Sequence, residues 1–154
     1  MEKITSRETL IREVADAMQM HFDECRQLIN LTTQEVGEWL DPILYGEDCK
    51  WPNEGDKVIE IEMPSSHEAF EVMEEFANSQ SDFIARKLWF ALEGKRPFAR
   101  FKDTVNFLGI QKKWYAFQNK WYEEKAEECL QMEGVEVKDG RIVTSGDYIT
   151  WSDD

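Results

Sequence analysis

The chain contains few of the residues from which metal sites, disulfide frameworks and nucleotide-binding loops are built. Its 154 residues include three cysteines and two histidines, with no Cys-x-x-Cys pair, which makes a structural zinc site improbable. The eight glycines are scattered, so that phosphate-loop, dinucleotide-loop and Gly-x-Ser-x-Gly patterns are all missing. From these absences we expect no catalytic motif, no metal ligands and no cofactor.

Long apolar runs are also missing, since nothing in the sequence approaches the roughly 18 apolar residues of a membrane span. The first twenty residues mix charged and apolar side chains, so they do not indicate a secretory signal. Cys25, Cys49 and Cys129 are widely spaced and odd in number, as is typical of thiols in a reducing compartment. We therefore expect a cytoplasmic protein without membrane attachment.

Basic residues are scarce, because 18 Lys and Arg stand against 32 Asp and Glu and leave a net charge of −14. Such a charge disfavours non-specific adhesion to nucleic acid or to an anionic membrane, which are themselves polyanions. The hydrophobic share is 42% and the aromatic share 12%, enough to fill one ordinary core. We expect a single domain over residues 1–154.

The first half of the sequence predicts a helix followed by a small antiparallel sheet. Apolar residues recur at helical spacing up to Met20, and Thr5 with Glu8 is typical of a capping box. The expected elements are a helix over 5–20, a hairpin of strands 25–32 and 36–40, an irregular connection over 41–56 and a strand over 58–63. In that connection, Leu44, Tyr45 and Trp51 are expected to anchor the chain.

The second half predicts a helical bundle and a terminal hairpin. Ser65 and Glu68 can cap a helical region that ends at Gly94, as one helix or as two. Further helices are expected over 97–108 and 111–132, and Asp139-Gly140 is a strong hairpin turn between strands 135–138 and 141–144. The tail over 145–154 is expected to dock. The fold class is therefore α+β, with a small antiparallel sheet, three to four bundled helices and a C-terminal β-hairpin.

A basic, aromatic-rich island covers residues 95–125. It holds eight Lys and Arg against three acidic residues, a formal charge of +5 inside an acidic protein. Phe98, Phe101, Trp114, Phe117 and Trp121 fall at helical core spacing, which leaves Tyr115 and Tyr122 as candidates for stacking on bases. The candidate anion-binding or partner-binding residues are Arg96, Arg100, Lys102, Lys112, Lys113, Tyr115 and Lys120.

These cations have two possible destinations. One is an external anion, such as RNA, single-stranded DNA or an acidic protein. The other is the acidic part of this same chain, and internal pairing is the favoured destination because the helices adjoin in sequence. The acidic residues in question are Glu68, Glu71, Glu74, Glu75 and Asp82.

The island also resembles an uncharacterised family of small bacterial proteins. The similarity rests on Arg96-x-Phe98-x-x-Phe101-Lys102-Asp103 followed by Trp114-x-x-Phe117, and it extends over roughly residues 70–136. The resemblance implies a soluble bacterial protein. It brings no activity, cofactor or catalytic residue with it.

Three functions follow from these patterns. The favoured one is a non-enzymatic interaction or regulatory module with a protein partner that contacts the island. The alternative is a nucleic-acid-binding protein that uses segment 95–125 on RNA or single-stranded DNA. The third is an enzyme whose site is not continuous in sequence, built around Cys49, His67 and carboxylates.

Overall fold

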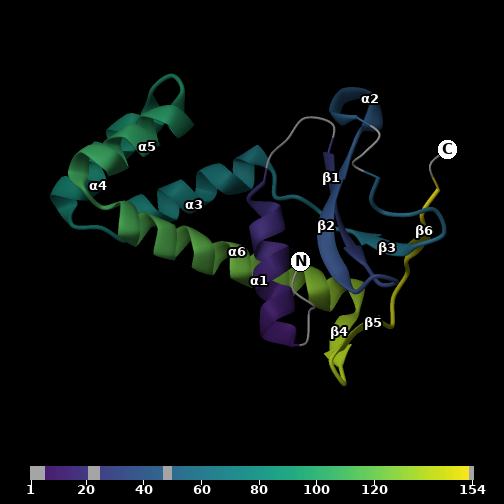
Figure 1. The fold of residues 1–154 in the computed structure, drawn as a ribbon. Coiled ribbons are helices and arrows are strands. Elements are labelled where there is room, and N and C mark those ends of the chain that lie inside the picture. Colours follow the sequence, from purple (N-terminus) through teal and green to yellow (C-terminus); the bar gives the residue numbers. More distant parts are fainter. Residues whose placement is uncertain (1–5, 21–24, 47–49, 153–154) are drawn as a thin grey trace. The chain divides into compact units, whose positions relative to one another are not determined.

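The computed structural model describes residues 6–20, 25–46 and 50–152 (Figure 1). These residues form six helices and two antiparallel sheets, which confirms the α+β class and the C-terminal hairpin. Their contacts group the chain into two compact units, Met1–Met63 with Tyr122–Asp154 and Pro64–Trp121. We call these the sheet unit and the helical unit. The expectation of a single domain stays a prediction.

The elements of each unit have the following bounds. The sheet unit holds α1 (Arg7–Met18), β1 (Cys25–Asn30), β2 (Glu35–Leu40), α2 (Pro42–Tyr45), β3 (Lys57–Glu60), the second half of α6 (Gln111–Glu133), β4 (Val135–Lys138), β5 (Arg141–Thr144) and β6 (Ile149–Thr150). The helical unit holds α3 (Ser66–Asn78), α4 (Asp82–Glu93), α5 (Pro97–Leu108) and the first half of α6.

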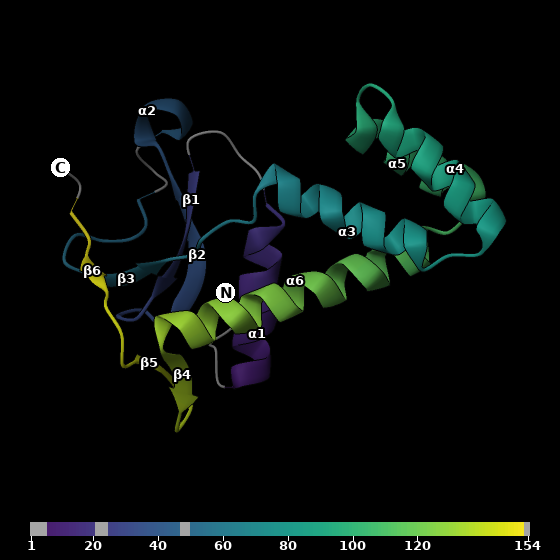
Figure 2. The ribbon, with the colours of Figure 1, turned by 180° about the vertical axis from the view of Figure 1, so that it is seen from behind.

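The larger sheet has the strand order β2-β1-β3-β6, and every neighbouring pair is antiparallel. Helix α1 packs against β1 and β2 (Figures 1 and 2). Leu28 and Ile29 are adjacent residues of the central strand β1, and both are completely buried. Because successive strand side chains point to opposite faces, this sheet is covered on both sides.

The side chain of Gln34 joins the terminal hairpin to the first hairpin. Its Nε2 donates to the carbonyl oxygens of Leu31 and Ile142, at 2.7 and 3.1 Å, and its Oε1 accepts from the N–H of Ile142. The side chain is buried, and Gln34 itself has a φ of 65°. A primary amide thus pairs with the backbone of β5 as a neighbouring strand would.

The helical unit follows its local sequence signals closely. The predicted capping box is present, since Glu68 N–H donates to Ser65 Oγ at 3.1 Å. Residues 79–81, of sequence Ser-Gln-Ser, separate α3 from α4, which resolves the open choice in favour of two helices. Gly109 ends α5 with a φ of 69°, a conformation that suits glycine because it has no Cβ.

Phe76 lies at the centre of the core of this unit. Its ring centroid is 6.2 Å from Phe101, 5.2 Å from Trp114 and 5.4 Å from Phe117. Only 1% of Phe76 is exposed, and Phe101 is fully buried. Tilted and edge-to-face contacts of this kind add to the burial of the rings.

Four sequence expectations need correction. The cap of α1 is Ser6, whose Oγ accepts from Thr9 N–H at 3.2 Å, one residue after the expected Thr5. The irregular connection contains the short helix α2, which Asp41 caps. Leu44 does not anchor it, because 61% of the residue is exposed, and Tyr45 is less buried than expected, with 41% exposed. The strand expected over 58–63 is shorter, since β3 ends at Glu60.

The tail docks as expected, and it also forms a strand that the sequence did not predict. β6 pairs with β3, where Val58 faces Ile149. Trp151 follows it, is 6% exposed, and packs on Leu28 and Val58 beside Trp39 and Trp51. Trp51 is therefore the one expected anchor that the structure confirms.

Candidate functional site

The predicted cations lie on α5 and α6 and at the turn before α5. Arg96 is the N-cap of α5 and has a φ of 53°. Arg100 is partly buried, and 56% of Tyr115 is exposed. The exposed cations of the predicted set are Arg96, Lys102, Lys112, Lys113 and Lys120.

The aromatic residues of the island mostly point inward, as their spacing predicts. Phe101 and Trp114 are buried, and their ring centroids are 4.8 Å apart. Phe117 and Trp121 pack against the same core, while Phe98 is 38% exposed and lies beside Phe70. These rings are therefore core side chains rather than platforms for bases.

Tyr122 is not a stacking residue, contrary to expectation. It is 5% exposed, and burial raises the pKa of its hydroxyl. Of the two tyrosines considered, only Tyr115 presents a ring to solvent. The island thus offers one exposed tyrosine, and the base-stacking interpretation loses a residue.

The ion pairs expected between the island and α3 are missing from the described residues. There, Arg96, Lys102, Lys112, Lys113 and Lys120 have no carboxylate within ion-pairing distance. Within α3, His67 Nε2 lies 3.0 Å from Glu71 Oε1, a contact that is an ion pair only when the imidazole is protonated. In the described residues, therefore, no direct ion pair neutralises the positive charge of these five residues.

Helical spacing divides the predicted set among several faces. Lys113 and Lys120 are seven residues apart and share one face of α6. Lys112 and Tyr115 are three residues apart and share another. Arg100 and Lys102 are two residues apart and point to different sides of α5. The set is therefore not a single continuous surface.

A second group of residues, which the sequence analysis missed, gathers around Arg100. Its guanidinium carbon lies 5.3 Å above the ring of Phe90, and its Nη2 donates to the Phe90 carbonyl at 3.4 Å. On the same helix α4, Lys87 Nζ lies 5.6 Å above the ring of Phe83. Phe83 and Phe90 are seven residues apart and so share a face of α4.

These phenylalanines are largely open to solvent. Phe83 is 66% exposed, Phe90 is 71% exposed, and Phe107 of α5 is 87% exposed. Phe107 follows Arg100 by seven residues and lies on the same side of α5. We define the α4–α5 face as Phe83, Lys87, Phe90, Arg100 and Phe107.

The sequence does contain a signal for this face. In α4 the buried residues are Leu88, Ala91 and Leu92, and both phenylalanines fall off that stripe. A large apolar residue off the buried stripe of an amphipathic helix points to solvent or to a partner. The exposed aromatic residues expected from the sequence were Tyr115 and Tyr122, and Phe83, Phe90 and Phe107 were not among them.

The positive charge also begins earlier than the island. Residues 86–120 hold nine Lys and Arg against two acidic residues, a net charge of +7. The helical unit, residues 64–121, carries nine basic and seven acidic residues, a net of +2. The rest of the chain, with nine basic and 25 acidic residues, carries −16.

Lys125, the last cation of the island, belongs to the sheet unit, and its Nζ lies 3.7 Å from Glu128 Oε2.

The residues considered for an enzyme do not form a site in the described part of the chain. The side chain of His67 is 81% exposed, so it does not have the dry surroundings that a tuned general base needs. Cys49 lies outside the described residues. Among the residues that are described, no three His, Cys, Asp or Glu side chains gather as metal ligands.

The Cys129 thiol gives a direct test of thiol reactivity. Burial raises its pKa, a hydrogen bond with the Glu62 backbone offsets part of this rise, and the nearby charges of Glu133 and Glu62 add to it. The thiolate is the reactive form, so a thiol with a raised pKa becomes reactive only at a higher pH. We expect iodoacetamide to alkylate Cys129 more slowly at pH 7 than an unhindered thiol in the denatured chain, as measured by mass spectrometry. Equal rates would contradict this expectation.

Comparisons with protein-family models, curated proteins and solved structures find no match to this chain. The resemblance to an uncharacterised bacterial family therefore stays a prediction. None of the helices in the described residues combines the length and apolar character needed to cross a bilayer.

Proposed function

We propose that this protein is a non-enzymatic interaction module that binds an acidic segment of a partner protein through the α4–α5 face. A cytoplasmic location and membership of the uncharacterised bacterial family belong to the same proposal. The observation that carries it is the exposure of three phenylalanines. Phe90 and Phe107 lie within the basic stretch 86–120, and Phe83 lies three residues before it. Exposed apolar patches rimmed by polar groups mark interaction sites.

The composition of the face favours a protein partner. Aromatic residues and Arg are enriched at the energetic centres of protein interfaces, where a few buried anchors dominate affinity. Arg100 and Lys87 are each held over a phenylalanine ring, so their charges are placed next to apolar anchors. An acidic segment with apolar side chains complements both features.

Charge favours a specific acidic partner over nucleic acid. The net charge of −14 repels a polyanion at long range, whereas a short acidic segment meets only the local positive field. One side of the Phe83 ring and one side of the Phe90 ring already contact cations. Each of those rings therefore has only one side left on which a base could stack.

Charge reversal tests the proposal with a matched control. We expect a Lys87→Glu and Arg100→Glu protein to lose its protein partner in pull-downs. A Lys112→Glu and Lys113→Glu protein, which has the same net charge, should keep it, because those residues lie outside the α4–α5 face. Circular dichroism of both proteins checks that they fold. Equal retention by the two variants would contradict the proposal.

A salt series tests the nucleic-acid alternative. Binding through phosphates would give a logarithmic slope of about −0.7 per phosphate contacted on a single strand. We expect no binding of labelled RNA or single-stranded DNA at low salt. Tight binding with a steep salt dependence, lost in the Lys112→Glu and Lys113→Glu protein, would replace the proposed function with the alternative.

A further inference from the structure

Strand β2 lies at an open edge of the larger sheet. In the order β2-β1-β3-β6 it has β1 as its neighbour on one side. On its other side, no strand pairs with it among the described residues. An exposed edge strand offers unpaired N–H and C=O groups to any extended chain that approaches it.

The sheet register shows which backbone groups are open. Ile61 N–H donates to Gln27 C=O at 2.9 Å, and Leu31 N–H donates to Lys57 C=O at 2.8 Å. Gln27 and Leu31 therefore direct their backbone groups towards β3. In an antiparallel sheet, bonding directions alternate along a strand, so Leu28 directs its groups towards β2.

The same alternation continues into β2. Leu28 is paired with Gly37, whose backbone groups consequently point back to β1. The neighbouring Glu38 points the other way, as do Val36 and Leu40, two residues before and after it. These three residues carry the N–H and C=O groups of β2 that no described strand pairs, and Val36 is the most buried of them, with 6% of the residue exposed.

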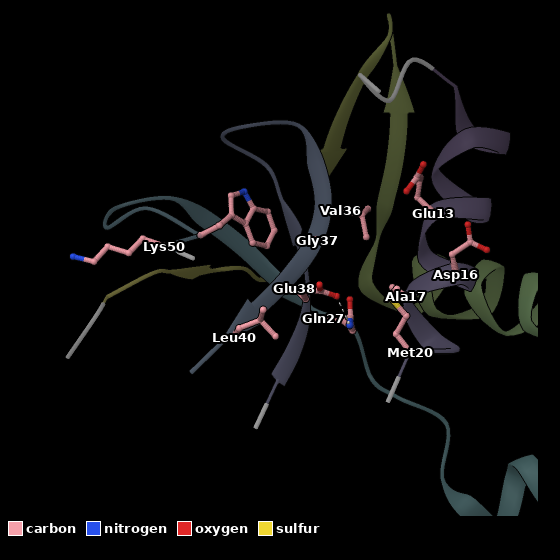
Figure 3. A pocket seen from close by; sticks show the side chains of 11 residues that line it. Glu13, Asp16, Ala17, Met20, Gln27, Val36, Gly37, Glu38, Leu40 and Lys50 are labelled. Carbon is pink, nitrogen blue, oxygen red and sulfur yellow. Dashed lines mark hydrogen bonds between the residues drawn. The ribbon is translucent and has the colours of Figure 1, made fainter. Parts of the chain in front are cut away.

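A groove of about 540 Å³ runs along this edge, and its lining includes the three residues with open backbone groups (Figure 3). Figure 3 shows Glu13 and Asp16 of α1, and Met20 just after that helix, on one side of β2, with Lys50 on the other side. The groove lies entirely within the sheet unit.

Trp51 forms the wall opposite α1. Its indole packs directly on Gly37, and a Cβ atom added there would lie 3.1 Å from Trp51 Cη2. That distance is tighter than nearly all real Cβ contacts, so Gly37 allows the ring to sit flat against the strand. The groove therefore has a helical wall on one face of β2 and an aromatic wall on the other.

The charge of the groove is negative. Glu13, Asp16 and Glu38 line it, and among the described lining residues Lys50 is the one cation. Gln27 is buried beneath them and its Nε2 donates to Glu38 Oε2 at 3.4 Å. With the rest of the chain outside the helical unit at −16, the field at this edge attracts a cationic ligand.

We propose that this groove binds an extended basic peptide segment of a partner protein, which adds to the sheet as a strand beside β2. Main-chain hydrogen bonds to Val36, Glu38 and Leu40 supply affinity, and side-chain pockets supply specificity. Alternate side chains of the peptide face α1 and Trp51. Lys or Arg fits the side with Glu13 and Asp16, and apolar residues fit the side with Trp51. This site is in a different unit from the α4–α5 face and does not depend on it.

The test uses the full-length ¹⁵N-labelled protein and a short acetylated peptide that alternates Lys and Val. We expect chemical-shift changes and slowed amide exchange at Val36, Glu38 and Leu40 on titration to millimolar peptide. A peptide with Glu in place of Lys should leave these signals unchanged. Methylation of peptide nitrogens that face β2 should abolish binding, whereas methylation of the intervening nitrogens should not.

A charge variant separates binding from folding. Asp16 lies in the last turn of α1, where a negative charge is unfavourable to the helix dipole, so Asp16→Lys will not weaken the helix. We expect it to weaken binding of the Lys-Val peptide by about tenfold. Glu127→Lys makes the same change in charge at an exposed position of α6, outside the groove, and should leave the affinity for the peptide nearly unchanged.

Three results would overturn the proposal. The first is the absence of shifts at the three β2 amides at millimolar peptide. The second is equal binding of the two N-methylated peptides, which would mean attraction without strand pairing. The third is a change in the chemical shifts of β2 with protein concentration when no peptide is present. This change would mean that a second copy of this chain binds the edge.

Discussion

A Phe76→Ala protein should lose about 3 to 5 kcal/mol of stability in its helical unit, as expected for removal of a large buried aromatic side chain. Phe76 is 1% exposed and contacts Phe101, Trp114 and Phe117. Its removal leaves a cavity between α3, α5 and α6 and ends three aromatic contacts. Urea denaturation followed by NMR signals of α3 to α5 measures the loss.

Phe107→Ala is the matched control for this experiment. It makes the same chemical change in the same unit, but Phe107 is 87% exposed. Surface substitutions usually change stability by no more than about 0.5 kcal/mol. Equal losses for Phe76→Ala and Phe107→Ala would contradict the assignment of one ring to the core and the other to the surface.

A Gln34→Ala protein should lose about 2 to 4 kcal/mol in the sheet unit, because it removes the hydrogen bonds to the buried N–H and C=O of Ile142 and to the partly buried C=O of Leu31. Gln34→Gly removes the same hydrogen bonds but accepts the φ of 65° without strain. We expect the glycine variant to be about 1 kcal/mol more stable than the alanine variant.

The measurement is denaturation followed by NMR signals of β1 and β5. Gln131→Ala serves as its control, since Gln131 is an exposed glutamine of α6 in the same unit. Full stability in Gln34→Ala would show that the side chain does not join the two hairpins. A glycine variant less stable than the alanine variant would argue against the strained backbone at this position.

Local signals explain why most of the fold can be predicted from this sequence. Ser65 with Glu68 caps α3, Gly109 ends α5, and Asp139-Gly140 turns the last hairpin. Each of these depends on side chains a few residues apart. Helix capping and turn formation need no knowledge of the rest of the chain.

The features that escaped prediction depend on distant contacts. Gln34 and Ile142 are 108 residues apart in sequence, and no local pattern links them. Strand β6 is two residues long and is defined by its pairing with β3. The open edge at β2 likewise follows from the strand order, which alternation of apolar residues does not determine.

The helical spacing of the aromatic residues in segment 95–125 predicted that most of them lie in the core, and the structure confirms this. Of the α4–α5 face, the sequence singled out Arg100 alone. It did not reveal that Arg100 lies over Phe90, since that contact joins two helices. It also favoured ion pairs with α3, which failed because helical spacing spreads the exposed cations over several faces.

The most direct measurement of the central claim is photo-crosslinking in cells, with p-benzoylphenylalanine in place of Phe90. Asn106, an exposed residue of α5, is the control position. The account predicts a discrete protein adduct from position 90 that is lost when Lys87→Glu is added, and none from position 106. Adducts to nucleic acid at position 90, or no difference between the two positions, would contradict the claim that the α4–α5 face binds a protein.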